Sequence, residues 1–292
     1  MYVGLDSFSY HRFFGDISPY EPDTAIRWQT TDFLSRANEL GVDAVCLQTA
    51  FLDMDNILAL KEPLAAAGLK PVLAWGHPAG LDGGADAASV EDLMATLFAA
   101  KRLGCSLLRF VAGHAHSYKE PAAERIERLL PIVKSVAETA AALDLSLAIE
   151  NHADFRMADL VSLVERVGAP NLGICFDGVN AVRVGDDLLL ATQLAAPHLR
   201  MVHVRDYLPL SGMPSDVEGF WPSVPPGCGQ LDISGLINFL DSYGYQGGLF
   251  VEIAYMHPDY ADEDKSVVQS LAVIKRRLAK TKYWLSKKEV VR

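Results

Sequence analysis

Eight short stretches of mostly apolar residues recur along the chain, and each precedes a longer stretch with the periodicity of an amphipathic helix. Most of the short stretches are continuously apolar, which is typical of parallel strands covered on both faces. The pattern predicts strands at residues 2–6, 44–48, 70–75, 107–112, 146–150, 172–177, 201–204 and 249–253. It predicts helices at 30–40, 55–67, 89–103, 121–143, 157–167, 187–195, 233–243 and 264–279. Eight such alternations favour an α/β fold, a single-domain (β/α)₈ barrel over residues 1–292, rather than an open doubly wound sheet.

Composition restricts the partners of this chain. Its 292 residues carry a formal net charge of −11 at pH 7, which repels phosphate backbones, so we expect no nucleic-acid partner. No glycine-rich nucleotide-binding fingerprint follows a strand. The first residues do not resemble a signal peptide, and no run of about 18 apolar residues predicts a membrane span. The four cysteines form no CxxC pair, which fits a reducing cytoplasm, and three of them lie in apolar stretches as core residues: Cys46, Cys105 and Cys175.

Each of the last four predicted strands ends on, or next to, a residue type that binds metals: Glu150, Asp177, His203 and Glu252. The carboxyl ends of barrel strands meet at one mouth, so we expect these side chains to converge. Three carboxylates and an imidazole gathered without a counter-charge carry a large electrostatic cost, which a divalent cation removes. Taken singly, each acid also fits a helix N-cap or the partner of an arginine. Four on consecutive strands favour one divalent ion: Mn²⁺, Mg²⁺, Co²⁺ or Zn²⁺.

The motifs around these residues resemble those of the xylose-isomerase-like barrel superfamily of sugar phosphate isomerases and epimerases, which also contains abasic-site nucleases of the endonuclease-four type. The resemblance covers essentially the whole chain and keeps the family's order. It rests on I-E-N-H at 149–152, F-D-G-V-N at 176–180, H-V-R-D at 203–206, P-G-C-G-Q-L-D at 226–232 and V-E-I at 251–253.

The resemblance implies a sugar isomerase or epimerase that works through a metal-stabilised cis-enediolate, with Glu150 and Glu252 as the proton-transferring pair. The substrate would be a small sugar or polyol-derived ketone. An alternative within the same superfamily is a lyase, such as an inosose-type or dehydroshikimate-type dehydratase or a C-glycoside deglycosidase. A further alternative is a barrel that binds metal or sugar without turnover.

The nuclease branch of the superfamily implies three zinc ions and additional histidines. His77 and His114 stand at two of those positions, but Asn180 replaces a third histidine. No Asp-x-His follows in 207–230, so the sequence favours one metal and disfavours an abasic-site nuclease. His77 and His114 then either contact substrate, support a second metal near Glu150, or lie in solvent-facing loops.

Other polar and aromatic residues near the strand ends are candidate substrate contacts: His152, Asn180, Arg205 and Trp75, with Trp221 as a second aromatic wall. For Arg205 the alternative is an ion pair with an aspartate at the rim. The aromatic stretch 8–20 is interpreted as a lid or a contact between subunits of a homo-oligomer. The glycine-rich stretch 227–229 is expected to approach substrate or to form a turn before an N-cap at Asp232. The basic segment 275–292 is expected to be a solvated helix and tail.

Overall fold

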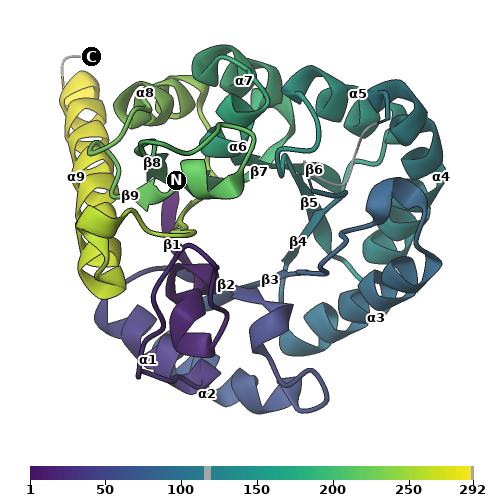
Figure 1. Ribbon diagram of the computed structural model, residues 1–292, viewed down its shortest axis with the longest axis horizontal. Helices are drawn as coiled ribbons and strands as arrows, with labels where there is room; N and C mark the ends of the chain where they lie inside the picture. The colour runs from purple at the N-terminus through teal and green to yellow at the C-terminus, as the bar shows by residue number, and fades with distance from the viewer. Residues whose placement is uncertain (115–119, 291–292) are drawn as a thin grey trace.

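Figure 1 shows a closed barrel of strands inside a ring of helices. This computed structural model describes the backbone of residues 1–114 and 120–290, and side chains as far as residue 279. Eight parallel strands close in the order β1-β10-β7-β6-β5-β4-β3-β2, which confirms the predicted (β/α)₈ barrel. The strands are β1 Tyr2–Asp6, β2 Ala44–Gln48, β3 Lys70–Ala74, β4 Leu107–Val111, β5 Ser146–Glu150, β6 Leu172–Asp177, β7 Leu199–Val204 and β10 Gly248–Val251.

The helices follow one another around the barrel in chain order (Figure 1). They are α1 Thr30–Glu39, α2 Lys61–Ala67, α3 Ala87–Leu103, α4 Ala122–Ala142, α5 Met157–Val167, α6 Gly178–Arg183, α7 Leu188–Ala195, α8 Ile233–Tyr243 and α9 Glu263–Val290. The expected start of the second helix at residue 55 is wrong, because a 3₁₀ turn at Ile57–Leu60 precedes α2. The short helix α6 was not predicted. No helix in the described part of the chain is long and apolar enough to cross a membrane.

The interior of the barrel explains why the polar strand ends face one another. Side chains two positions apart on a strand point to the same face. The barrel centre is packed with small or apolar side chains, including Ala148, Cys175, Met201 and Phe250. Two residues further along each strand, the inward position is therefore occupied by Glu150, Asp177, His203 or Glu252. The register adds to this alignment, since Asp177 lies directly opposite His203 across the β6–β7 pair.

The cysteines agree with the sequence analysis. None of the four forms a disulfide, and Cys46, Cys105 and Cys175 are buried as predicted. Cys46 and Cys175 fill the barrel centre, where their small side chains fit the narrow space between strands.

The aromatic stretch after β1 forms the 3₁₀ segment Ser7–Phe14, which contacts the first residues of α9. Arg12 pairs with Glu263, and the hydroxyl of Tyr10 donates a hydrogen bond to Asp264 at 2.8 Å. The guanidinium of Arg36 pairs with the same Asp264 at 2.7 Å. These contacts attach the stretch to α1 and α9 at the mouth of the barrel.

The long stretch after β7 is partly ordered by a two-stranded antiparallel ribbon, β8 Asp206–Tyr207 with β9 Ser223–Val224. Between the two strands lies a 3₁₀ turn at Glu218–Phe220. Beyond Ala279 the basic side chains of the predicted tail lie outside the described residues.

Candidate active site

The four predicted metal-binding residues converge at the barrel mouth. Each offers one ligand atom, and the four atoms lie within 4.8 Å of one another. Nδ1 of His203 is 3.7 Å from Oε1 of Glu150 and 3.5 Å from Oε2 of Glu252. All four side chains are buried, Glu252 the least completely at 5% exposed. The cluster therefore forms the floor of the mouth, with Glu252 nearest to the open space above it.

Behind His203 lies an acidic partner. Nε2 of His203 is 3.6 Å from Oδ2 of Asp6, and neither atom has a hydrogen-bond partner among the described residues. The other oxygen of Asp6 accepts hydrogen bonds from the N–H of Phe8 and from Gln48. Asp6 thus caps the 3₁₀ segment that follows β1. A carboxylate in this position is common behind metal-binding histidines, where it orients the ring.

Two buried arginines offset part of the acidic charge. Arg109 on β4 pairs with Glu150. Nε of Arg205 donates to Oδ2 of Asp177 at 2.7 Å. The alternative of an ion pair between Arg205 and an aspartate is therefore confirmed, but the pair lies in the floor of the site and not at the rim, since the side chain of Arg205 is only 6% exposed.

Asp206, beside Arg205, has a separate structural role. Its carboxylate accepts hydrogen bonds from the backbone N–H groups of Gly227, Gly229 and Leu231, at 3.0, 3.0 and 2.9 Å. The glycine-rich stretch 227–229 is consequently bound to Asp206, and it does not belong to the residues lining the pocket. Its interpretation as a turn is supported, together with the N-cap at Asp232, whose side chain accepts from Gly235 N–H.

The two glutamates of the expected proton-transferring pair have opposite environments. Burial raises the pKa of Glu252 to about 7, despite the opposing charges of His203 and Arg205. Burial acts in the same direction on Glu150, but Arg109 and His203 outweigh it and hold the pKa of Glu150 well below its usual range. Burial opposes protonation of His203, and the surrounding negative groups nevertheless raise the pKa of His203 well above its usual range. Glu252 is therefore the carboxyl group suited to exchange a proton near neutrality.

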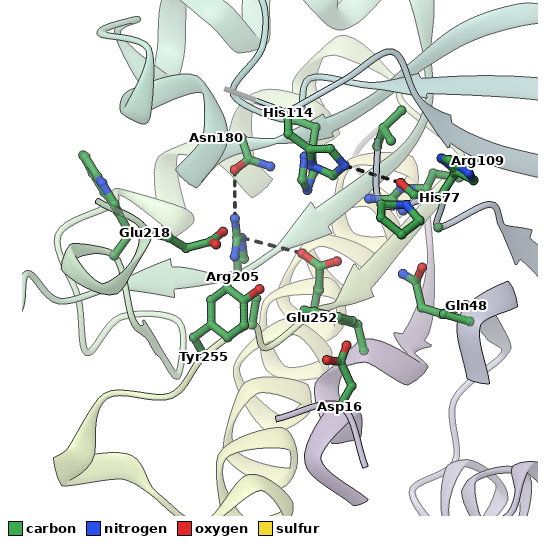
Figure 2. Close-up of a pocket in the computed structure, with 18 of the residues that line it drawn as sticks. Asp16, Gln48, His77, Arg109, His114, Asn180, Arg205, Glu218, Glu252 and Tyr255 are labelled. Atoms are coloured by element: carbon green, nitrogen blue, oxygen red, sulfur yellow. Dashed lines mark hydrogen bonds and ion pairs between the residues drawn. The ribbon is translucent and has the colours of Figure 1, made fainter. Parts of the chain in front are cut away.

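A cavity of about 370 Å³ opens above this floor. Among the predicted substrate contacts, its lining includes His77, His114, His152, Asn180 and Arg205, as well as Trp221. Figure 2 shows Arg205 between Asn180 and Glu252, with His77 and Arg109 across the cavity. The imidazole of His152 is edge-on to that of His114 with ring centroids 4.6 Å apart. The structure thus brings these candidates to one space.

Trp75 is a correction to the sequence-based prediction. Its side chain is fully buried in the core and does not line the cavity. The indole N–H donates to Asp92 on α3 at 2.6 Å, and His77 stacks on the ring. Trp75 is therefore a core residue, because its indole N–H is satisfied by Asp92 and does not need a partner in the cavity. Its ring packs against His77 and supports that side chain.

The residues of the floor fit a divalent cation. Three carboxylates and an imidazole are a suitable donor set for such an ion. Nδ1 of His203 faces two of these carboxylates without a hydrogen-bond partner among the described residues, which is the state expected of a nitrogen that binds a cation. His77 and His114 do not join any group of possible metal-binding residues in the described chain.

Several residues of the site were missed by the sequence analysis: Arg109, Arg183, Asp16, Glu218, Tyr255 and the second contact of Asp6. Arg109 did carry a signal, since it is the one charged residue inside the apolar run 107–112. Arg183 and Tyr255 lie beyond their strand ends, where a sequence gives no information on which way a loop turns.

The chain belongs to the xylose isomerase-like TIM barrel family, whose sequence model matches residues 34–277. A curated relative, the uncharacterized protein YihM of Escherichia coli (strain K12), is 28% identical over 123 residues, or 42% of this chain and 36% of the relative. The match thus spans about a third of the length of that relative.

Solved structures share the fold. An L-ribulose 3-epimerase structure superposes with a TM-score of 0.73 at 19% identity, covering 99% of this chain and 97% of that one. The probable 3-DHS dehydratase AsbF of Bacillus anthracis superposes with a TM-score of 0.70 at 14% identity, covering 94% and 99%. At these identities, the likeness concerns the fold.

Proposed function

We propose that this protein is a divalent-metal-dependent sugar isomerase or epimerase. The observation that carries the proposal is the convergence of Glu150, Asp177, His203 and Glu252 beneath a cavity large enough for a small sugar. Membership of a family named for xylose isomerase and the fold shared with an epimerase are consistent with it. The four free cysteines suit a reducing compartment, and we propose the cytoplasm.

We assign metal binding and proton transfer to two sets of residues, which overlap at Glu150 and Glu252. Glu150, Asp177, His203 and Glu252 would hold the cation, which when bound polarises a substrate carbonyl and acidifies the neighbouring C–H. Glu252 lines the cavity, so it is placed to take that proton and return it.

Glu150 is the more restricted partner of the pair. Arg109 and the amide of Asn180, 3.3 Å from Oε1, hold its carboxylate in place. Glu150 would receive or deliver a proton only when these two contacts loosen. Proton return to the neighbouring carbon gives an isomer, and return to the opposite face of the same carbon gives an epimer.

The test is hydrogen exchange in D₂O. Purified protein with Mn²⁺ is incubated with a panel of ketoses, and proton NMR follows the signal next to the carbonyl. The proposal predicts deuterium at that carbon for at least one ketose, with loss of exchange on chelation. Absence of exchange across a broad panel of ketoses would contradict it.

A lyase remains the second candidate, because aromatic side chains line part of the cavity: Phe8, Phe51, Trp221 and Tyr255. Such a wall suits a ring or aryl substrate, and the shared fold with a probable dehydratase is consistent. Elimination from the same enolate would release water or an aglycone irreversibly. A new ultraviolet absorbance with cyclic ketone substrates, unaccompanied by reversible exchange, would identify this branch.

A further inference from the structure

One end of the cavity is formed by two arginines that converge on a single neutral oxygen. Oδ1 of Asn180 lies 3.1 Å from Nη2 of Arg205 and 3.4 Å from Nη1 of Arg183. Both guanidinium groups line the cavity. An amide oxygen carries no net charge, so it accepts one hydrogen bond from each guanidinium group but offsets the charge of neither.

Arg183 has most of its hydrogen-bonding capacity unused. It is the last residue of α6, and its side chain is only 16% exposed. Beyond the long contact to Asn180, neither Nε nor Nη2 has an acceptor among the described residues. Burial lowers the pKa of Arg183, Glu218 opposes this, and Arg205 lowers the pKa further. A guanidinium with five N–H groups in so enclosed a place normally has a charged partner.

Arg205 has fewer unused N–H groups than Arg183, but one of its nitrogen atoms is also available to a ligand. Its Nε is engaged by Asp177 and its Nη2 by Asn180, while Nη1 has no acceptor among the described residues. The charge of Asp177 already offsets that of Arg205. At the arginine end of the cavity, the positive charge that lacks a hydrogen-bonded acidic partner is therefore that of Arg183.

Glu218 is the acid nearest to Arg183. Its Oε1 lies 3.6 Å from Nη1, a distance at which no hydrogen bond forms. Glu218 belongs to the 3₁₀ turn between β8 and β9, and its side chain is 38% exposed. In Figure 2 its carboxylate points towards the cavity and Arg205. A carboxylate thus reaches the arginine end from a surface turn without being hydrogen-bonded to it.

We propose that Arg183, with Nη1 of Arg205, binds an acidic group of the substrate, a carboxylate or a phosphate, and that the side chain of Glu218 occupies the approach to this group when no substrate is bound. The inference rests on the proposed function, because it takes the cavity to be the substrate pocket. It narrows the substrate class to sugar acids or sugar phosphates whose anionic group lies away from the carbon that loses its proton.

The hydrogen bonding of Arg183 differs from that of an arginine with a purely structural role. Arg12, a buried arginine outside the cavity, has acceptors of its own chain for all three of its nitrogen atoms: Glu263, Pro22 and Ala261. Arg183 instead presents unpaired N–H groups to an open cavity. Two guanidinium groups facing one space are the usual geometry for carboxylate and phosphate recognition.

The test is calorimetric binding of three six-carbon probes that lack an aldehyde or ketone and cannot be turned over: D-glucitol, D-gluconate and D-glucitol 6-phosphate. Chelator-treated full-length protein is used, so that an anion cannot bind through a metal. We expect at least one of the two anionic probes to bind about tenfold more tightly than D-glucitol. Preference for D-gluconate identifies a carboxylate, and preference for D-glucitol 6-phosphate identifies a phosphate.

Substitutions test whether the preference for an anionic probe depends on Arg183 and Glu218. Arg183→Gln is expected to abolish the preference for the anion, and Arg183→Lys to keep part of it. Glu218→Gln is expected to tighten anion binding about threefold, because a competing carboxylate is removed. Arg166→Gln removes the same charge from an exposed arginine that pairs with Glu127 on the outer helices, and should change nothing.

Equal affinity for all three probes in the unmodified protein would overturn the proposal. Retention of the preference in a folded Arg183→Gln variant would do the same, and so would weaker anion binding in Glu218→Gln. The readout involves neither metal nor turnover, so these outcomes are independent of the exchange experiment that tests the proposed function.

Discussion

Nδ1 of His203 lies 3.5 Å from Oε2 of Glu252, and no hydrogen bond joins the two atoms. Oε1 of Glu150 lies 3.7 Å from the same nitrogen. Three possible metal-ligand atoms therefore surround one point, and the nitrogen is hydrogen-bonded to neither oxygen. A cation at that point would contact all three. This arrangement is the physical basis of the metal proposal, and the first prediction follows from it.

Manganese is expected to stabilise the protein against unfolding through His203. Ligand at about 100 times its Kd adds about 2.7 kcal/mol to the free energy of unfolding, visible as a rise in Tm. His203→Gln should lose most of this rise, because the amide is a poorer ligand for the cation than imidazole nitrogen. His198→Gln is the matched control, since His198 pairs with Glu165 on the outside of the barrel. An equal rise of Tm in both variants would contradict the assignment.

Arg109 is expected to contribute most to the stability of the protein when no metal is bound. Arg109→Met leaves Glu150 buried without its ion-pair partner, which typically costs about 3–5 kcal/mol of unfolding free energy. A cation would supply the missing positive charge, so Mn²⁺ should stabilise this variant more than the unmodified protein. Denaturant unfolding with and without Mn²⁺ measures the difference. Arg128→Met, at an exposed pair with Glu120, should show little loss and no additional metal effect.

Asp154 predicts a dependence of stability on pH. Burial raises its pKa from 3.8 to about 7, so between these values the folded state holds a proton that the unfolded state has lost. The free energy of unfolding therefore falls as pH rises through this window, by roughly 1–4 kcal/mol from this group. Asp154→Asn removes this contribution and should be more stable than the unmodified protein at pH 8, but about equal near pH 4. Parallel stability–pH curves for the two proteins would contradict this reading.

The two tryptophans near the mouth are expected to respond differently to substitution. Trp75→Phe loses the indole bond to Asp92 inside the core and should reduce the free energy of unfolding by about 1–3 kcal/mol. Trp221→Ala removes part of the cavity wall and should leave stability within about 1 kcal/mol while weakening substrate binding. Chemical unfolding and KM measurements separate the two effects. A large rise of KM in a well-folded Trp75→Phe variant would argue against its place in the core.

The sequence predicted the barrel well because its strands are continuous apolar runs. The bounds of β1, β2, β5 and β6 agree with the expected ranges. Helix α6 was missed because it has only six residues, too few to show a helical periodicity. The side chain of Asp177 also accepts hydrogen bonds from the N–H groups of Val179 and Asn180, so it caps the helix as well.

The positions of the floor residues followed from strand-end chemistry, whereas their surroundings did not. Period-two alternation places Glu150 two residues after the buried Ala148, and the same rule applies on the neighbouring strands. The partner Arg109 lies on β4, beside the strand that carries Glu150, but the sequence does not show that its side chain points to the mouth. Asp6 lies on β1, far from His203 in the chain, and only the closed barrel brings the two together. The error on Trp75 has the same origin, since its hydrogen-bond partner Asp92 lies on a helix outside the barrel.

The most direct test of the central proposal is anomalous diffraction from a crystal soaked in Mn²⁺. We predict one strong peak about 2.0–2.3 Å from carboxylate oxygens of Glu150, Asp177 and Glu252 and from Nδ1 of His203. Binding there requires Arg109 and Arg205 to yield part of their contacts with Glu150 and Asp177, so both guanidinium groups should shift when the peak appears. A peak elsewhere, or a floor that keeps its two ion pairs with no bound ion at saturating Mn²⁺, would contradict the account.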